Sequence, residues 1–215
     1  METRAVRPPL SDRLIAPIIR YVDRRLRRRQ RIFEYDADAR CVFRLSVHPF
    51  EQAHQWPDGI RTAEREIVGE LHLWNEHFAG LNLLGCGGEL RGRFDYSMRA
   101  LARRVASDPA LRMLPGIFAD SWVPSDHRSN GVARSFVRWG FRIDQESDRL
   151  EFWDQLYVRL LARTFNPGAP RGPVRRIRIW ISREELMRRF GESPAVRRRP
   201  APAAEESQRR LTAGG

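Results

Sequence analysis

The sequence of 215 residues is long enough for one well-packed domain with extensions. Although 41% of its residues are hydrophobic, no apolar run approaches the roughly 20 residues of a membrane span. The first ten residues lack the apolar segment of a secretory signal, and two cysteines form neither a disulfide framework nor a zinc-type spacing. A cytoplasmic protein is therefore expected.

The net charge of +12 comes from arginine alone, because the sequence contains no lysine. Residues 1–35 hold ten Arg against four acidic residues, and residues 191–215 hold five against three. The central residues 36–190 hold 24 Arg against 20 acidic residues. A general coding preference for arginine explains the missing lysine. The concentration of charge in the extensions argues against a nucleic-acid-binding core.

Residues 1–35 predict a basic amphipathic N-terminal helix. It starts near Ser11 with Pro17 in its first turns, and its apolar residues follow helical spacing: Ile15, Ile18, Ile19, Val22 and Leu26. Arginines crowd the remaining surface, and five are candidate contacts to an anionic partner: Arg24, Arg25, Arg27, Arg28 and Arg29. The helix either packs on its own domain with a solvated basic face, or lies peripherally on the anionic inner face of a membrane.

Three strands are predicted after this helix, over residues 41–47, 60–62 and 66–75. A strong turn signal, Pro57-Asp58-Gly59, precedes the second of them. Because the connections are short, the pattern predicts an antiparallel meander.

The third strand is the most informative stretch of the chain. Side-chain alternation places Glu70 and His72 on one face with Val68 and Trp74, while the leucines point to the other. A carboxylate and an imidazole on an otherwise apolar strand are costly unless they have partners.

A glycine-rich loop at 85–88 precedes a helix predicted over 89–106. The loop lacks the Lys-Ser/Thr of a phosphate-binding loop and the spacing of a dinucleotide fingerprint, so it is interpreted as a flexible connection and no cofactor is expected. A strand at 116–123, a helix at 128–139 and a strand at 141–144 predict a crossover with parallel pairing, in which Gly140 caps the helix.

A helix over 148–165 and an alternating strand over 174–181 complete the core. Ser182 and Glu185 have the spacing of a capping box, which predicts a last helix over 183–190. The predicted fold class is α+β, with a mixed sheet of about five or six strands packed against helices. Its organisation has three parts: the basic helix over 1–35, a single core domain over 36–191 and a disordered Pro/Ala-rich tail over 192–215.

One motif and the order of elements carry a resemblance. The motif is Gly69-Glu70-Leu71-His72-Leu73-Trp74-Asn75, supported by the segments Trp139-Gly140-Phe141 and Ile179-Trp180-Ile181-Ser182. Over about residues 12–191 the chain resembles the YkoP-like domain family, whose hallmark is Gly-Glu-Leu-His-Leu-x-Asn. Members are sometimes fused to polysaccharide deacetylase or glycosyltransferase domains. The resemblance therefore implies an accessory role in cell-envelope polysaccharide metabolism, with no activity assigned.

The candidate ligand-binding residues are Glu70, His72 and Asn75. As an acid–base pair, Glu70 and His72 could support catalysis. Metal binding would need further ligands, and no spacing brings the candidates His48, His77 and Asp120 to them, so no metal site is predicted. Alternatively the pair is structural, with Arg176 or Arg178 neutralising Glu70. Tryptophans are expected in the core, and an exposed Trp74 or Trp180 would instead indicate a sugar-binding cleft.

Three functions remain open on the sequence. The first is an accessory domain that binds a polar ligand, such as an envelope glycan, through Glu70, His72 and Asn75. The second is a hydrolase or transferase with Glu70 and His72 as its acid–base pair. The third is an electrostatic binder of an anionic membrane surface or nucleic acid through the arginine-rich helix.

Overall fold

The computed structural model describes residues 10–78, 88–124, 129–147, 152–165 and 174–191. These residues form the following elements: α1 (Leu10–Arg29), β1 (Phe43–Pro49), β2 (His54–Gln55), β3 (Arg61–Thr62), β4 (Ile67–Leu73), α2 (Asn75–Phe78), α3 (Gly88–Ser107), α4 (Pro109–Arg112), β5 (Gly116–Pro124), α5 (Ser129–Arg138), β6 (Arg142–Ser147), α6 (Phe152–Phe165), β7 (Val174–Ser182) and α7 (Arg183–Phe190). The glycine-rich loop before Gly88 and the predicted disordered tail lie outside the described residues. Within the described residues, no helix has both the length and the apolar character needed to cross a membrane.

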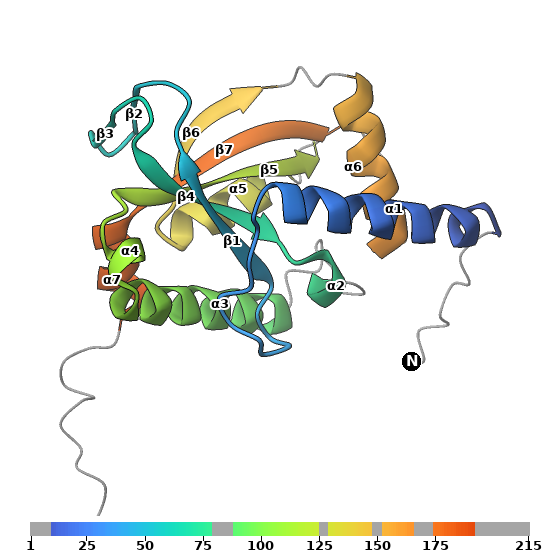
Figure 1. Cartoon of the computed structure of the whole chain (residues 1–215), viewed down its shortest axis with the longest axis horizontal. Coiled ribbons are helices and arrows are strands. Elements are labelled where there is room, and N and C mark those ends of the chain that lie inside the picture. The colour runs from blue at the N-terminus through green and yellow to red at the C-terminus, as the bar shows by residue number, and fades with distance from the viewer. Residues whose placement is uncertain (1–9, 79–87, 125–128, 148–151, 166–173, 192–215) are drawn as a thin grey trace, which may run out of the picture.

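Five strands form one mixed sheet in the order β1-β4-β5-β7-β6, and β2 and β3 form a separate two-stranded sheet (Figure 1). β1 and β4 are antiparallel, β4 and β5 are parallel, and β7 is antiparallel to both of its neighbours. The predicted α+β fold with a mixed sheet of five or six strands is therefore confirmed.

Two predicted strand pairings are wrong. β3 does not join β1 and β4 in a meander, because it pairs with the short strand β2 and leaves β1 and β4 to pair directly with each other. β5 and β6 do not pair in parallel, because β7 lies between them and forms antiparallel ladders with both. In each case the local sequence pattern does not indicate which of several strands is the pairing partner.

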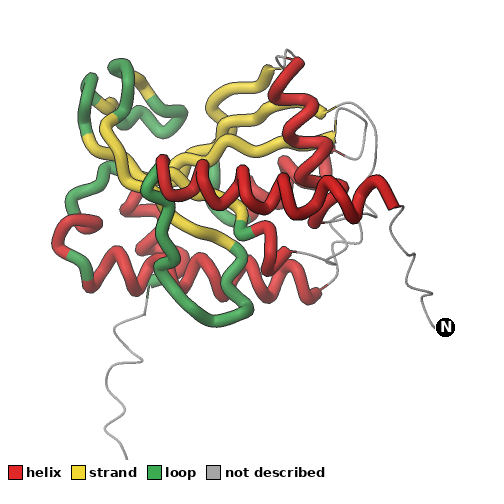
Figure 2. The backbone as a smooth tube through the Cα atoms, turned by 45° about the vertical axis from the view of Figure 1, so that its right-hand side comes forward, coloured by secondary structure: helices red, strands yellow, loops and turns green. Residues whose placement is uncertain are grey.

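The main hydrophobic core lies on one face of the large sheet. There α3 and α7 pack against alternate residues of the central strands, and the buried members include Leu45, Leu71, Met98, Leu101, Ile117, Ile179 and Leu186. A smaller aromatic cluster contains Trp56, Val68, Phe118 and Trp180. Its centre is the stack of Trp56 on Trp180, whose ring centroids are 4.0 Å apart. Because Trp56 directly follows β2 and Trp180 lies in β7, this stack holds the loop around β2 and β3 against the sheet. Figure 2 shows the backbone of this segment, which is mostly loop.

α1 packs against α6 at the side of the molecule (Figure 1). It begins at Leu10, so Pro17 lies inside the helix and not in its first turns as predicted. Ile19 is buried and Ile18 is 63% exposed, so the inward face is narrower than the predicted apolar stripe. Asp23 takes part of that face, with only 7% of its surface exposed.

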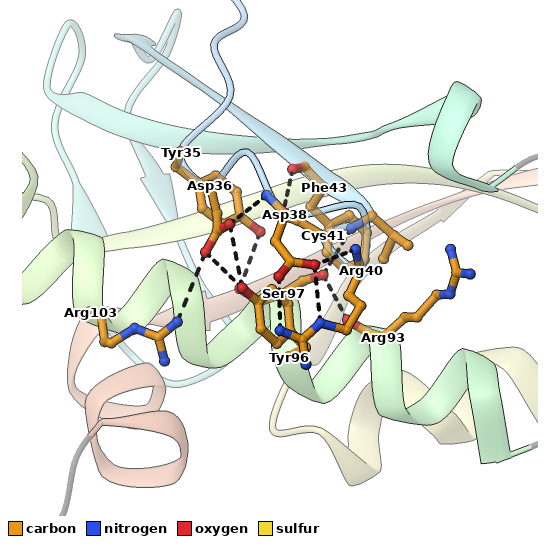
Figure 3. A network of polar contacts seen from close by, with 11 residues as sticks. Tyr35, Asp36, Asp38, Arg40, Cys41, Phe43, Arg93, Tyr96, Ser97 and Arg103 are labelled. Atoms are coloured by element: carbon orange, nitrogen blue, oxygen red, sulfur yellow. Dashed lines mark hydrogen bonds and ion pairs between the residues drawn. The ribbon is translucent and has the colours of Figure 1, made fainter.

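The segment before β1 is fastened to α3 by polar contacts (Figure 3). The Tyr35 hydroxyl donates to the Ser97 carbonyl at 3.2 Å, and the Val42 N–H donates to Ser97 Oγ at 2.9 Å. The Tyr96 hydroxyl donates to the Asp36 carboxylate at 3.3 Å. These bonds satisfy the backbone of an irregular segment and fix the position where β1 starts.

The predicted Gly140 cap forms, and the predicted capping box forms in its Ser182 half, while the Glu185 carboxylate binds Arg188 and Arg189. Gly140 has φ 95°, and the bonds from Gly140 N–H to the Val137 carbonyl and from Phe141 N–H to the Phe136 carbonyl complete a Schellman motif. At the start of α7, the Glu185 N–H donates to Ser182 Oγ at 3.3 Å. Local sequence signals were therefore sufficient at these two helix ends.

Candidate functional site

The register of the sheet gathers polar side chains on the face opposite the main core. Ser46 lies opposite Glu70, Glu70 lies opposite Phe118, and Asp120 lies opposite Arg178. Residues in register share a face, so the polar positions of successive strands form one row. We call this row the polar strip; it consists of Ser46, His48, His54, Glu70, His72, Asp120, Asp144, Arg176 and Arg178.

At one end of the polar strip, Glu70 lies between two histidines. Its Oε2 atom is 3.0 Å from His48 Nε2 and 3.6 Å from His72 Nε2. The side chains of Glu70 and His72 are 23% and 20% exposed, so they are neither sealed in the core nor fully solvated. The predicted placement of Glu70 and His72 on one face is confirmed.

The hydrogen bonds of His48 define its protonation. Its Nδ1 lies 3.2 Å from the Pro49 carbonyl oxygen, which only accepts, and its Nε2 faces the Glu70 carboxylate. Both ring nitrogens therefore face acceptors, which favours the doubly protonated imidazolium, and the hydrogen bond with Glu70 raises the pKa of His48 above its ordinary value of 6.5, against the opposing effect of burial. When it is protonated, His48 forms an ion pair with Glu70.

The pKa of His72 is shifted in the opposite direction. Burial lowers its pKa below the ordinary value of 6.5, and the Glu70 charge only partly opposes this effect. Its Nε2 is 2.8 Å from Ser46 Oγ. Because Ser46 and Glu70 approach the same ring nitrogen, they do not flank the imidazole as in a serine triad, and Ser46 is only 1% exposed. Ser46 positions His72 and is not a nucleophile.

The centre of the polar strip is an arginine–carboxylate cluster. Arg178 makes two hydrogen bonds to Asp120, at 2.9 and 3.0 Å, and Arg176 also contacts this carboxylate. Burial tends to raise the pKa of Asp120, but the hydrogen bonds from Arg178 and Arg176 outweigh it and the pKa is lowered. The Arg178 guanidinium also lies over the Phe118 ring, 5.3 Å from its centroid.

The far end of the polar strip reaches β6. His54 Nε2 lies 2.9 Å from Asp144 Oδ1, and the Asp144 side chain is only 6% exposed. The other carboxylate oxygen, Asp144 Oδ2, is buried and has no hydrogen-bond partner among the described residues. The hydrogen bond with Asp120 is the main cause that raises the pKa of Arg178, and the charges of Asp144 and Glu70 add to it, so both ends of the strip act on that guanidinium.

The structure separates Asn75 from the other predicted ligand-binding residues. Asn75 starts α2, and its side chain lies near Asp23 on α1, where burial raises the pKa of the Asp23 carboxyl and Asn75 is among the smaller effects that oppose this. His77, a candidate metal ligand, donates from Nδ1 to the Cys41 carbonyl at 2.7 Å and stacks on Trp74. These residues fasten α2 to its surroundings.

One further prediction about the site needs correction, namely the arginine partner of Glu70, whereas the expected burial of the tryptophans is confirmed. Glu70 is neutralised by His48, whereas Arg176 and Arg178 bind Asp120. Trp74 and Trp180 are 6% and 0% exposed, so neither forms the open platform that would have supported a sugar-binding cleft. In the part of the chain that the structure describes, no group of three His, Cys, Asp or Glu residues is arranged to hold a metal ion.

The arginines of α1 fall into two groups, one that faces the protein and one that is exposed. Arg27 turns inward and pairs with Asp23 at 3.1 Å and with Glu76 at 3.0 Å. The other four predicted contacts to an anionic partner are exposed: Arg24, Arg25, Arg28 and Arg29. Arg27 is therefore a structural residue.

Sequence reasoning missed three members of the polar strip: Ser46, His54 and Asp144. Ser46 and His48 alternate with apolar residues on their strand, which was a usable signal. His54 and Asp144 are 90 positions apart, and no local pattern joins them.

Comparison with protein-family models, curated proteins and solved structures gives no match for the chain. The resemblance to the YkoP-like domain family stays a prediction.

Proposed function

We propose that the polar strip binds a small polar ligand rich in hydroxyl groups, such as a sugar of a cell-envelope polysaccharide or its precursor. The observation that carries the proposal is the partial exposure of its charged groups: 23% for Glu70, 17% for Asp120 and 20% for Arg178. These donors and acceptors are held in place by their neighbours and still reach solvent. Fixed polar groups of both kinds in a row suit a ligand with several hydroxyls.

A second candidate is acid–base catalysis in a hydrolase or transferase. It is favoured by one observation: the pKa of His48 is raised and that of His72 is lowered on either side of Glu70. Two groups whose pKa values are shifted in opposite directions can serve as acid and base near neutral pH. In this role His48 donates a proton, and His72 accepts one while Glu70 holds His48 in place.

The test of binding is a saturation-transfer NMR screen of the full chain against glucose, N-acetylglucosamine, galactose and glucuronic acid, followed by calorimetry. Glu70→Gln should weaken binding about tenfold or more, because a hydrogen bond to a charged group contributes about 1.5–3 kcal/mol. The matched control is Glu64→Gln, a carboxylate that is 67% exposed and outside the polar strip. Equal affinity for a folded Glu70→Gln variant and wild type would overturn the proposal.

Turnover distinguishes the two candidates. The nitrophenyl glycosides of the same sugars are incubated with the wild-type chain and with His72→Ala. Catalysis predicts a bell-shaped pH profile that loses one limb in His72→Ala, whereas binding alone predicts saturable affinity with no release of nitrophenol.

A further inference from the structure

The outward side of α1 combines exposed apolar and cationic side chains. Residues 18, 21, 25 and 28 follow helical spacing on one surface, and Arg24 lies beside them. We call this surface the outer face of α1; it consists of Ile18, Tyr21, Arg24, Arg25 and Arg28. Ile18 and Tyr21 are 63% and 60% exposed, which is unusual for two large apolar side chains one turn apart.

The positive charge on this face has no acidic counterpart on the same helix surface. From residue 17 to residue 31 the sequence contains one carboxylate, Asp23. Asp23 is 7% exposed and faces inward, where it pairs with Arg27. The outward arginines therefore produce a positive electrostatic potential over this face.

The helix is also held rigidly by its inner side. Ile19 is buried, and Arg27 ties the last turns of α1 to Glu76 on α2. A partner that contacts the outer face meets a helix that is already formed and docked, with no segment to fold first. This lowers the entropic cost of binding.

We propose that the outer face of α1 docks on the headgroup layer of an anionic lipid membrane. Arg24, Arg25 and Arg28 bind lipid phosphates, and Ile18 and Tyr21 enter the boundary between headgroups and acyl chains. Arginine clusters suit any polyphosphate, but an exposed isoleucine beside them gains nothing from a nucleic acid backbone. Its transfer out of water favours a lipid surface.

The experiment is flotation of the full chain with phosphatidylcholine vesicles that contain phosphatidylglycerol, and with vesicles of phosphatidylcholine alone. Wild type should float only with the anionic vesicles and should be released by salt. Reversal of three charges, Arg24→Glu, Arg25→Glu and Arg28→Glu, should weaken partitioning at least about a hundredfold, since each cation near such a surface contributes about fivefold.

The matched control reverses three exposed arginines elsewhere: Arg61→Glu, Arg99→Glu and Arg112→Glu, on β3, α3 and α4. It changes the net charge equally and should retain most of the binding. The pair Ile18→Ser and Tyr21→Ser should reduce partitioning at unchanged charge. Circular dichroism checks that each variant is folded.

Three results would overturn the proposal. The first is equal flotation with neutral and anionic vesicles, or none with either. The second is equal loss in the outer-face and control variants, which would make the interaction a net-charge effect. The third is tight binding of an RNA or DNA oligonucleotide that Ile18→Ser and Tyr21→Ser leave unchanged, together with weak flotation, which would assign the face to nucleic acid.

Discussion

Glu70 lies between two histidines whose protonation responds to it in opposite ways. The pKa of His48 is raised in the folded chain, so its contribution to stability is fully present below about pH 6.5 and is lost as the pH rises through the folded-state pKa. The pKa of His72 is lowered, so its contribution is present above about pH 6.5 and is lost as the pH falls through the folded-state value. The two effects together predict highest stability near pH 6.5.

Single variants separate these two contributions. The free energy of unfolding is measured with urea across about pH 5 to 8, a range that brackets the ordinary histidine pKa. Its decline on the alkaline side should disappear in His48→Gln, and its decline on the acid side should disappear in His72→Gln. In Glu70→Gln, the NMR titration of His48 should move to lower pH, because its charge-assisted hydrogen bond is gone. A His48 titration that does not respond to Glu70→Gln would contradict the ion pair.

At the scale of single residues, the sequence could reveal which side chains share a face but not which ones touch. Alternation along one strand was enough to place Glu70 with His72, because it depends on backbone geometry alone. The partner of Glu70 depends on the register between β4 and β1, which brings in His48. A one-residue change in that register would alter every cross-strand contact. Because the sequence does not show the register, it could not identify His48 as the partner, and the predicted arginine partner was wrong.

The start of β5 illustrates a packing constraint at the scale of an element. A Cβ added at Gly116 would come within 2.3 Å of the Trp180 ring and 2.6 Å of the Ile181 carbonyl oxygen. Trp180 is fully buried and stacks on Trp56, so it cannot move away. We expect Gly116→Ala to lower the free energy of unfolding by about 3 kcal/mol, at the upper end of overpacking effects.

The comparison for this prediction is Gly92→Ala inside α3. Apart from the neighbouring backbone of α3 itself, no atom of the described residues lies within 4 Å of a Cβ added there, and alanine favours a helix over glycine by about 1 kcal/mol. The same chemical change should therefore stabilise the chain at residue 92 and destabilise it at residue 116, as measured by urea denaturation. Equal effects at both positions would show that the Trp180 stack yields to the added methyl group.

Helices whose ends are marked by capping residues were predicted well, whereas the pairing partners of the strands were not. The Schellman motif at Gly140 and the Ser182 cap involve residues within a few positions of one another, so the sequence contains all the necessary information. β7 is separated from β6 by α6 and from β5 by α5, β6 and α6, yet it pairs with both strands. Local patterns favour the nearer strand, which is why the predicted β5–β6 pairing was wrong.

At the scale of the whole molecule, the attachment of α1 depends on a chain of ion pairs beneath it. Arg27 binds Glu76 on α2, and Glu76 also binds Arg44 on β1 at 3.2 Å. Arg44 reaches a further acid, Glu34, at 3.1 Å. The sequence indicated a basic amphipathic helix, but it did not indicate that Asp23 and Arg27 face the protein. Their orientation depends on charged residues that other elements contribute.

Arg44 is the central member of this chain and offers a sharp test. It is only 4% exposed, its guanidinium lies 4.2 Å from the centroid of the Trp74 ring, and it joins three segments of the molecule. Arg44→Ala should lower the free energy of unfolding by about 2–3 kcal/mol, somewhat less than the loss for a fully buried pair, because Glu34 and Glu76 can still be solvated. Hydrogen exchange of α1 should accelerate along with that of β1.

Arg40 provides the matched comparison for Arg44. It is the same residue type four positions earlier and makes two hydrogen bonds to Asp38, but its side chain is 62% exposed (Figure 3). Exposed ion pairs are screened by water and contribute little, so Arg40→Ala should leave the unfolding midpoint nearly unchanged. If Arg40→Ala and Arg44→Ala shift that midpoint equally, then burial does not set the importance of the two pairs, and the docking of α1 must depend on its apolar contacts with α6 instead.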